Sequence, residues 1–180
     1  MWVIADQRPF QYRPDVLFWQ SDPLGDEVHL SGQVTVNLFA STNSTDADWI
    51  IKLIDVFPDD GVPEALRGYQ MLLAYDTFRA KYFMLDSQNT TARFSSPQPV
   101  PPGVLVEYTF KLPHRNHAFL RGHRIMVQLQ STMFPLVERN PQKFMNTTEA
   151  RVADFVIAEH CVAHSPLYLS RLSFPTLKDV

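Results

Sequence analysis

The sequence predicts an all-β protein that folds as an antiparallel sandwich or barrel. Apolar and polar residues alternate with a period of two in several short segments, most clearly over residues 104–112 and 124–130. Clusters of glycine, proline, asparagine, aspartate and serine separate these segments, as they separate strands in antiparallel sheets. About eight short strands with little credible helix favour two packed sheets or one closed sheet.

The longest apolar run, residues 46–58, is predicted to be a central strand. It is rich in β-branched and aromatic residues and is bounded by turn-forming residues on both sides. With a period of two, one face carries Trp49 and Ile51 and the other carries Ile50 and Ile54, so both faces are largely apolar. A strand with two apolar faces belongs inside a sheet rather than at its edge.

Lys52 and Asp55 interrupt this run on opposite faces, and both are candidates for structural ion pairs. An unpaired charge in such surroundings is costly, so each needs a partner or a route to water. Asp76 and Arg79, in a later predicted strand, are the candidate partners. The alternative for Lys52 is an extended stem that carries its ammonium group to solvent.

The other elements follow from the same reasoning. Residues 1–14 mix charge, proline and aromatic residues without period, and we expect an incoming arm there, ahead of a domain over residues 15–180. Residues 69–85 fit a helical stripe nearly as well as two interrupted strands, and we favour strands. Four prolines make residues 87–103 an extended connection, and residues 113–122 are expected to be a loop. The predicted strands are 15–20, 28–40, 46–58, 69–85, 104–112, 124–130, 151–159 and 167–172.

Length and charge exclude several classes of partner. At 180 residues the chain is long enough for one domain with a sizeable core. A net charge of −3 and a pI near 6.0 argue against binding to nucleic acid. No stretch is apolar and long enough to cross a bilayer, and residues 1–10 lack the pattern of a signal peptide. The single cysteine excludes an internal disulfide and leaves the cellular compartment open.

The sequence contains no recognisable catalytic motif. A serine hydrolase of the α/β type needs a Gly-x-Ser-x-Gly elbow, and all six glycines here are isolated. His160 and Cys161 are adjacent, but neighbours on a strand point to opposite faces, so they are not expected to form a dyad. A packed, inert thiol is the favoured interpretation of Cys161. We therefore expect the isolated domain to be inactive.

Two groups of residues have a composition compatible with metal binding. The histidines offer some zinc-like spacings but no helix that presents them together, so loop histidines in water are favoured. Four acids in two polar loops have oxygen ligands suited to calcium, yet their spacing matches no calcium loop, and solvated turn acids are favoured. No metal or other cofactor is expected. The residues are His114, His117, His123, His160 and His164, and Asp46, Asp48, Asp59 and Asp60.

The long excursion of residues 131–148 is a candidate docking segment. It carries bulky apolar residues where water normally selects polar ones, so it either folds back over the core or docks on a partner. We favour docking. The candidate contacts with another domain are Phe134, Leu136, Arg139 and Asn140.

Five motifs occur in an order typical of one hydrolase family. They are Asp6-Gln-Arg, Arg13-Pro-Asp-Val-Leu17, the run from Asp48 to Asp59, the run from His117 to Ile125, and Phe134-Pro through Asn140-Pro141. The chain resembles the C-terminal domain of the X-Pro dipeptidyl-peptidase and cocaine esterase family. Within it, the first two motifs and Lys52-Leu-Ile-Asp-Val56 are most similar to α-amino-acid ester hydrolases and glutaryl cephalosporanic acid acylases.

The resemblance implies a galactose-binding-like jelly-roll β-sandwich that follows an α/β-hydrolase domain with a helical cap. That catalytic part holds the Ser-Asp-His triad, and no catalytic residue can be carried over to a position here. The expected function is therefore to pack on the catalytic domain and help shape the substrate entrance. A carbohydrate-binding-like module and a structural domain that forms homo-oligomers are the alternatives. The resembling enzymes are often exported, and the choice between esters, β-lactam amides and X-Pro peptides stays open.

Overall fold

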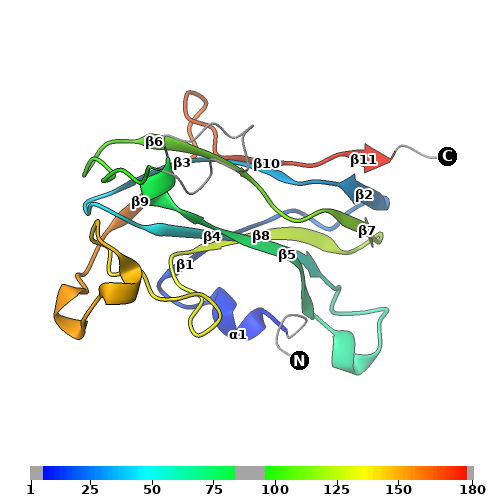
Figure 1. Ribbon diagram of the computed structural model, residues 1–180. Helices are drawn as coiled ribbons and strands as arrows, with labels where there is room; N and C mark the ends of the chain where they lie inside the picture. Colours follow the sequence, from blue (N-terminus) through cyan, green and yellow to red (C-terminus); the bar gives the residue numbers. More distant parts are fainter. Residues whose placement is uncertain (1–5, 84–95, 178–180) are drawn as a thin grey trace.

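The computed structural model describes residues 6–83 and 96–177, and all of its strand pairs are antiparallel. Figure 1 shows two stacked layers of sheet. The lower layer has the order β1-β8-β4-β5. These strands are Val16–Gln20, Arg124–Gln130, Asp48–Val56 and Gln70–Arg79. The predicted all-β sandwich is confirmed.

The upper layer consists of a four-stranded sheet and a three-stranded sheet. Each strand of the three-stranded sheet is next in the chain to a strand of the other: β11 to β10, β2 to β3 and β7 to β6. One sheet is β10-β3-β6, with β9 also paired to β3, and the other is β11-β2-β7. The strands are Arg171–Ser173, Thr35–Thr42, Val106–Lys111, His160–Ala163, Thr176–Leu177, Val28–Gly32 and Arg115–Phe119. The layer is interrupted near Gly32, whose φ of +132° and 2.8 Å approach of Pro175 to an added Cβ leave room only for glycine.

The helices are short. They are α1 (Arg8–Gln11) and the single 3-10 turns η1 (Glu64–Leu66), η2 (Ala80–Tyr82), η3 (Thr147–Glu149) and η4 (Val152–Asp154). None of those in the described residues has the length and apolar character that a membrane crossing requires. Residues 1–14 were expected to be an arm without regular structure, but they contain α1, which has a proline in its first turn.

The main core lies between the two layers. β4 is buried at all nine positions and lies between β8 and β5, which confirms the prediction of a central strand. Trp49 of β4 contacts Tyr108 of β6 with ring centroids 5.5 Å apart, and Phe78 of β5 stacks on Phe110 of β6 at 5.2 Å. Large aromatic rings bury much apolar area each, so these contacts hold the layers together.

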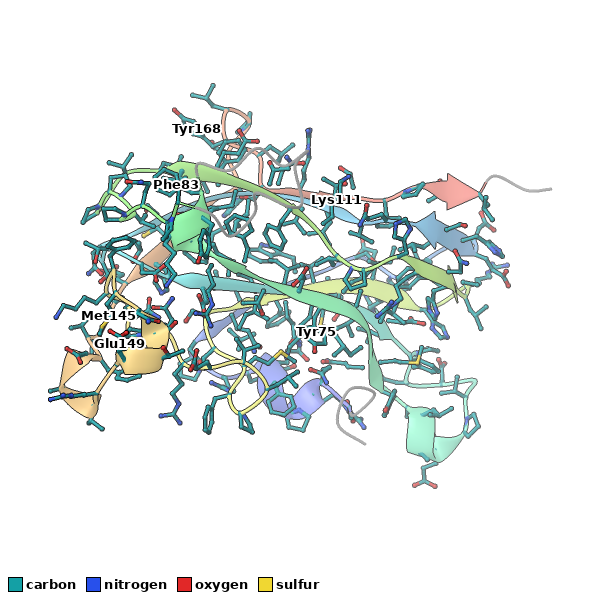
Figure 2. The ribbon with its side chains drawn as sticks, viewed as in Figure 1. Tyr75, Phe83, Lys111, Met145, Glu149 and Tyr168 are labelled. Carbon is teal, nitrogen blue, oxygen red and sulfur yellow. The ribbon has the colours of Figure 1, made fainter. Side chains whose placement is uncertain are left out.

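The other face of the lower layer is covered as well, which is unusual for an antiparallel sheet. A second cluster of buried apolar residues lies there, formed by Ile54, Val56, Leu72 and Met126, with Tyr75 packed against it. In Figure 1, α1 and the loop after β8 lie beneath this outer face, and Figure 2 shows Tyr75 on the side of the sheet toward α1. The covered outer face positions the surface described below.

Five predicted segments differ from the structure, and one of them is 167–172, of which only Arg171 and Leu172 lie in a strand, β10. Residues 113–122 were expected to be a loop, but β7 lies there because its residues pair with β2. Residues 151–159 were expected to be a strand, but they form η4 and irregular backbone, with Ile157 fully exposed. The predicted strand 28–40 is divided into β2 and β3. Of the segment 69–85, residues 69–83 are described, and they contain one strand, β5, followed by η2. The connection 87–103 lies partly outside the described residues, and residues 96–103 form no helix or strand.

Candidate docking surface

Residues 6–15, which precede β1, are packed on the folded domain. The backbone N–H of Gln7 donates to the carbonyl of Gln70 at 3.0 Å, and the side chains of Gln70 and Gln11 are hydrogen-bonded. Gln7 and Gln11 are both buried. These contacts fix α1 against the outer face of the lower layer, and its Phe10 and the adjacent Tyr12 remain exposed at 39% and 81%.

Lys52 points from β4 into the space between the sheet and α1. Only 2% of Lys52 is exposed, so the alternative in which its stem reaches solvent is wrong. Its Nζ donates to Gln7 Oε1 at 2.9 Å and lies 5.2 Å from the centroid of the Phe10 ring. Burial, together with repulsion from Arg13, lowers the pKa of Lys52 to about 8.

The strand register explains why Lys52 does not pair with Asp76. Lys52 lies opposite Tyr75, whereas Asp76 lies opposite Ile51, so the two charges are on different faces of the sheet. Within the residues that the structure describes, Lys52 forms no salt bridge with a carboxylate. The expected ion pair Lys52–Asp76 is therefore corrected to a hydrogen bond with an amide.

Asp55 is likewise not paired with Arg79, because Arg79 lies opposite Asp48 at the other end of β4. Asp55 accepts instead from His117 Nε2 at 2.9 Å and from His123 Nδ1 at 2.8 Å. Asp55 and His123 are buried. The interpretation of these two histidines as loop residues in water is wrong, whereas His114 and His164 are exposed as expected.

A buried polar cluster ties the long excursion to the sandwich. Asn140 Nδ2 donates to Asp48 Oδ1 at 2.9 Å, and Arg79 donates to Thr147 Oγ1 at 2.6 Å. Lys81 Nζ lies 3.5 Å from Asp46 Oδ2 and donates to the carbonyl of Met145 at 3.2 Å. The excursion is thus fixed at three points along its length.

The acids of this cluster are buried rather than solvated, which corrects the expectation for Asp46 and Asp48. Burial raises the pKa of Asp48 to about 6, against the opposing effects of the Asn140 hydrogen bond and Arg79. Burial also raises the pKa of Asp46. Asp59 and Asp60 are exposed, as expected for turn acids. Among the described residues, no group of three or more histidines, cysteines and acids is placed to hold a metal ion.

The structure separates the four candidate contacts into two kinds. Phe134 and Leu136 are 59% and 45% exposed, and the guanidinium carbon of the exposed Arg139 lies 4.6 Å from the centroid of the Phe134 ring. Asn140 is only 6% exposed, and its amide holds Asp48. Asn140 is therefore an internal anchor and is corrected from a docking contact to a positioning residue.

Sequence reasoning missed further exposed apolar residues in the segment that contains η4. Val152 and Ile157 are 92% and 101% exposed, and Phe155 and Val156 are exposed as well. The signal was present, because these apolar residues do not alternate with a period of two, as a half-buried strand requires. The segment is held to the excursion by a hydrogen bond from Val156 N to the Pro141 carbonyl at 3.2 Å.

We call the exposed apolar residues on this side of the molecule the docking surface. Figure 1 shows α1, the loop after β8 and the segment with η3 and η4 all on the lower side, and Figure 2 places Met145 and Glu149 on that last segment. The docking surface consists of Phe10, Tyr12, Phe134, Leu136, Phe144, Val152, Phe155, Val156 and Ile157.

His160 and Cys161 do not form a dyad. His160 is half-buried, its ring packs edge-on against Trp49 at 5.0 Å, and burial lowers its pKa. The free Cys161 is exposed, so the expectation of a packed thiol is wrong. Because they are neighbours on β9, the two side chains point to opposite faces.

Comparison with known proteins identifies larger hydrolases as relatives. The chain is 30% identical over 174 residues to cocaine esterase from Rhodococcus sp. (strain MB1 Bresler), which covers 97% of this chain and 28% of the esterase. An aminopeptidase from a marine sediment Thaumarchaeota archaeon is 40% identical with a TM-score of 0.90, and an α-amino acid ester hydrolase is 37% identical with the same TM-score. Both structural matches cover 98% of this chain and 28% of the other chain.

The chain thus spans about 28% of the length of these relatives. Residues 3–173 match the model of the X-Pro dipeptidyl-peptidase C-terminal non-catalytic domain. The resemblance inferred from the motifs is confirmed. The chain belongs to the family of X-Pro dipeptidyl-peptidase C-terminal non-catalytic domains.

Proposed function

We propose that this chain is the C-terminal domain of a serine hydrolase of the α/β type and packs on the catalytic domain of the same polypeptide through the docking surface. The relatives are more than three times longer and include an esterase, an aminopeptidase and an ester hydrolase. Each relative has room for a catalytic domain outside the part matched here. The substrate entrance of such an enzyme is then shaped in part by the loop that carries Phe134.

The observation that carries this proposal is a rigidly anchored segment with an apolar outer surface. Val152 and Ile157 are almost completely exposed, and a free surface loop gains nothing from such side chains. The excursion of residues 131–148, to which this segment is joined by the hydrogen bond from Val156 N to the Pro141 carbonyl, is fixed by buried contacts of Asn140, Thr147 and the Met145 carbonyl. Ordering a long loop costs conformational entropy. A loop that is already held in one shape does not lose this entropy when a complementary domain binds it, so the binding is stronger.

The double variant Val152→Ser, Ile157→Ser tests this proposal in the full-length hydrolase. If both side chains are buried against the catalytic domain, the variant loses the stabilisation that comes from burying their apolar surface. We therefore expect the melting temperature of the full-length protein to fall by about 4 °C or more. The isolated chain, in which both are exposed, should melt within about 1 °C of the parent chain.

Leu177→Ser provides the matched control, because Leu177 is 57% exposed on β11 at the far end of the upper layer (Figure 1). It should leave both proteins unchanged. A full-length double variant that melts like the parent protein would show that the segment with η4 is not part of the interface.

A further inference from the structure

An open pocket of about 350 Å³ lies between the two layers beside β1 and β10, and a smaller cavity lies beside Lys52. That cavity has a volume of about 310 Å³ and lies on the outer face of the lower layer, between α1 and the loop after β8. Its wall is mainly apolar and ends at the exposed ring of Phe134, so the cavity opens on the docking surface. Its lining includes Phe10, Arg13, Lys52, Gln130, Met133 and Phe134.

Two cations face this cavity, and among the residues that the structure describes only one of them, Arg13, has a carboxylate partner. The Nε of Arg13 donates to Asp15 Oδ1 at 2.9 Å, and this pair is exposed. The ammonium group of Lys52 can donate three hydrogen bonds, and its one hydrogen bond within the described residues goes to the neutral amide of Gln7. Contact with the Phe10 ring compensates only part of the loss of water around a buried cation.

A lysine that only stabilises the fold is seldom buried with a neutral amide as its hydrogen-bond partner, because burying its charge without an opposite charge is costly. A buried charge is normally matched by an opposite charge, as Lys81 is matched by Asp46 elsewhere in this protein. Lys52 is as deeply buried as Lys81, yet it faces a cavity lined by a second cation. A site with this charge and these walls is complementary to a carboxylate carried on a short aliphatic stem.

We propose that this cavity receives an Asp or Glu side chain of the catalytic domain, whose carboxylate pairs with Lys52 when the two domains pack together. The inference rests on the proposed function and deepens it, because it names a charged contact within an otherwise apolar interface. Phe10 and Phe134 then exclude water from the ion pair. The pair fixes the orientation of the two domains, since a misplaced acid would be left buried without its partner.

The variant Lys52→Met tests the proposal through the sign of its effect in two contexts. In the isolated chain it replaces an uncompensated buried charge by an apolar side chain of similar length, and we expect the melting temperature to stay the same or rise by up to about 5 °C. In the full-length hydrolase it leaves the partner's carboxylate buried and unpaired, and we expect the melting temperature to fall by about 5 °C or more.

Lys81→Met is the matched control, because the partner of Lys81 lies within this chain. It should lower the melting temperature in both contexts. Lys52→Arg keeps the positive charge and should retain most of the stability of the full-length protein. This rescue distinguishes a lost ion pair from a general failure of Lys52→Met to fold.

A Lys52→Met variant with the same effect in both contexts would overturn the proposed ion pair. The Val152→Ser, Ile157→Ser variant then separates the two ideas. If it still destabilises only the full-length protein, the docking surface holds and only the charged contact fails. If it has no effect either, the proposed function fails as well.

Discussion

Because of Lys52, the stability of the isolated chain is expected to change with pH in the alkaline range. Burial, and to a smaller extent Arg13, lowers the folded-state pKa of Lys52 to about 8 from its ordinary value of 10.5. Between these values the unfolded state binds more protons than the folded state, so the free energy of unfolding rises as the pH rises. Below pH 8 both states are protonated and the gain disappears. The gain by pH 10 is on the order of 2 kcal/mol.

Urea denaturation of the parent chain and of Lys52→Met at pH 7.5 and pH 9.5 measures this contribution. The parent chain is expected to gain stability relative to the variant over this interval. If the free energy of unfolding changes equally in both proteins between the two pH values, or rises more in the variant, Lys52 is not buried as a cation in the folded chain.

The partners of the two buried charges show what the sequence could not predict. The need for partners followed from the placement of Lys52 and Asp55 in an apolar strand. Their identity depends on contacts far apart in the chain, since His117 and His123 are more than 60 residues from Asp55. The register with β5 also shifts at a bulge between Leu53 and Ile54, which no local pattern reveals.

At the scale of elements, the loop after β8 combines internal anchors with exposed contacts. Phe134→Ala should change the free energy of unfolding of the isolated chain by less than about 1 kcal/mol, because its ring is already exposed. Asn140→Ala should destabilise the same chain by about 1–3 kcal/mol, because it leaves the Asp48 carboxylate without this hydrogen bond. Urea denaturation measures both.

Phe110→Ala is the reference for a core phenylalanine, since Phe110 is 3% exposed and stacks on Phe78. It should cost about 3–5 kcal/mol. A Phe134 variant that loses as much as the Phe110 variant would show that the ring closes the end of the core instead of facing a partner.

Strands with strong alternation were predicted well, and segments whose structure depends on a neighbour were not. β6 and β8 alternate clearly because each has one apolar face against the core. β7 has no such pattern, because Arg115 donates to the backbone carbonyl of Leu73 and His117 donates to the carboxylate of Asp55. The segment with η4 was predicted to be a strand, but its apolar residues do not pack against this domain's core, and Ile157 is fully exposed.

At the scale of the whole molecule, both faces of the lower layer are covered by other parts of the chain. Its inner faces form the main core, and the outer face of the lower layer holds α1 and the loop after β8 in place. The motifs predicted the family, because they lie mainly in these structural elements. They could not predict the docking surface completely, since an interface is complementary to residues of another domain.

Hydrogen–deuterium exchange of the isolated chain and the full-length hydrolase tests the central claim most directly. Docking removes backbone amides from water, so residues 133–137 and 152–157 should exchange at least about tenfold more slowly in the full-length protein. Residues 171–177, at β10 and β11 in the other layer, should exchange equally in both proteins. Equal exchange at residues 133–137 and 152–157 would contradict the assignment of this surface to the catalytic domain.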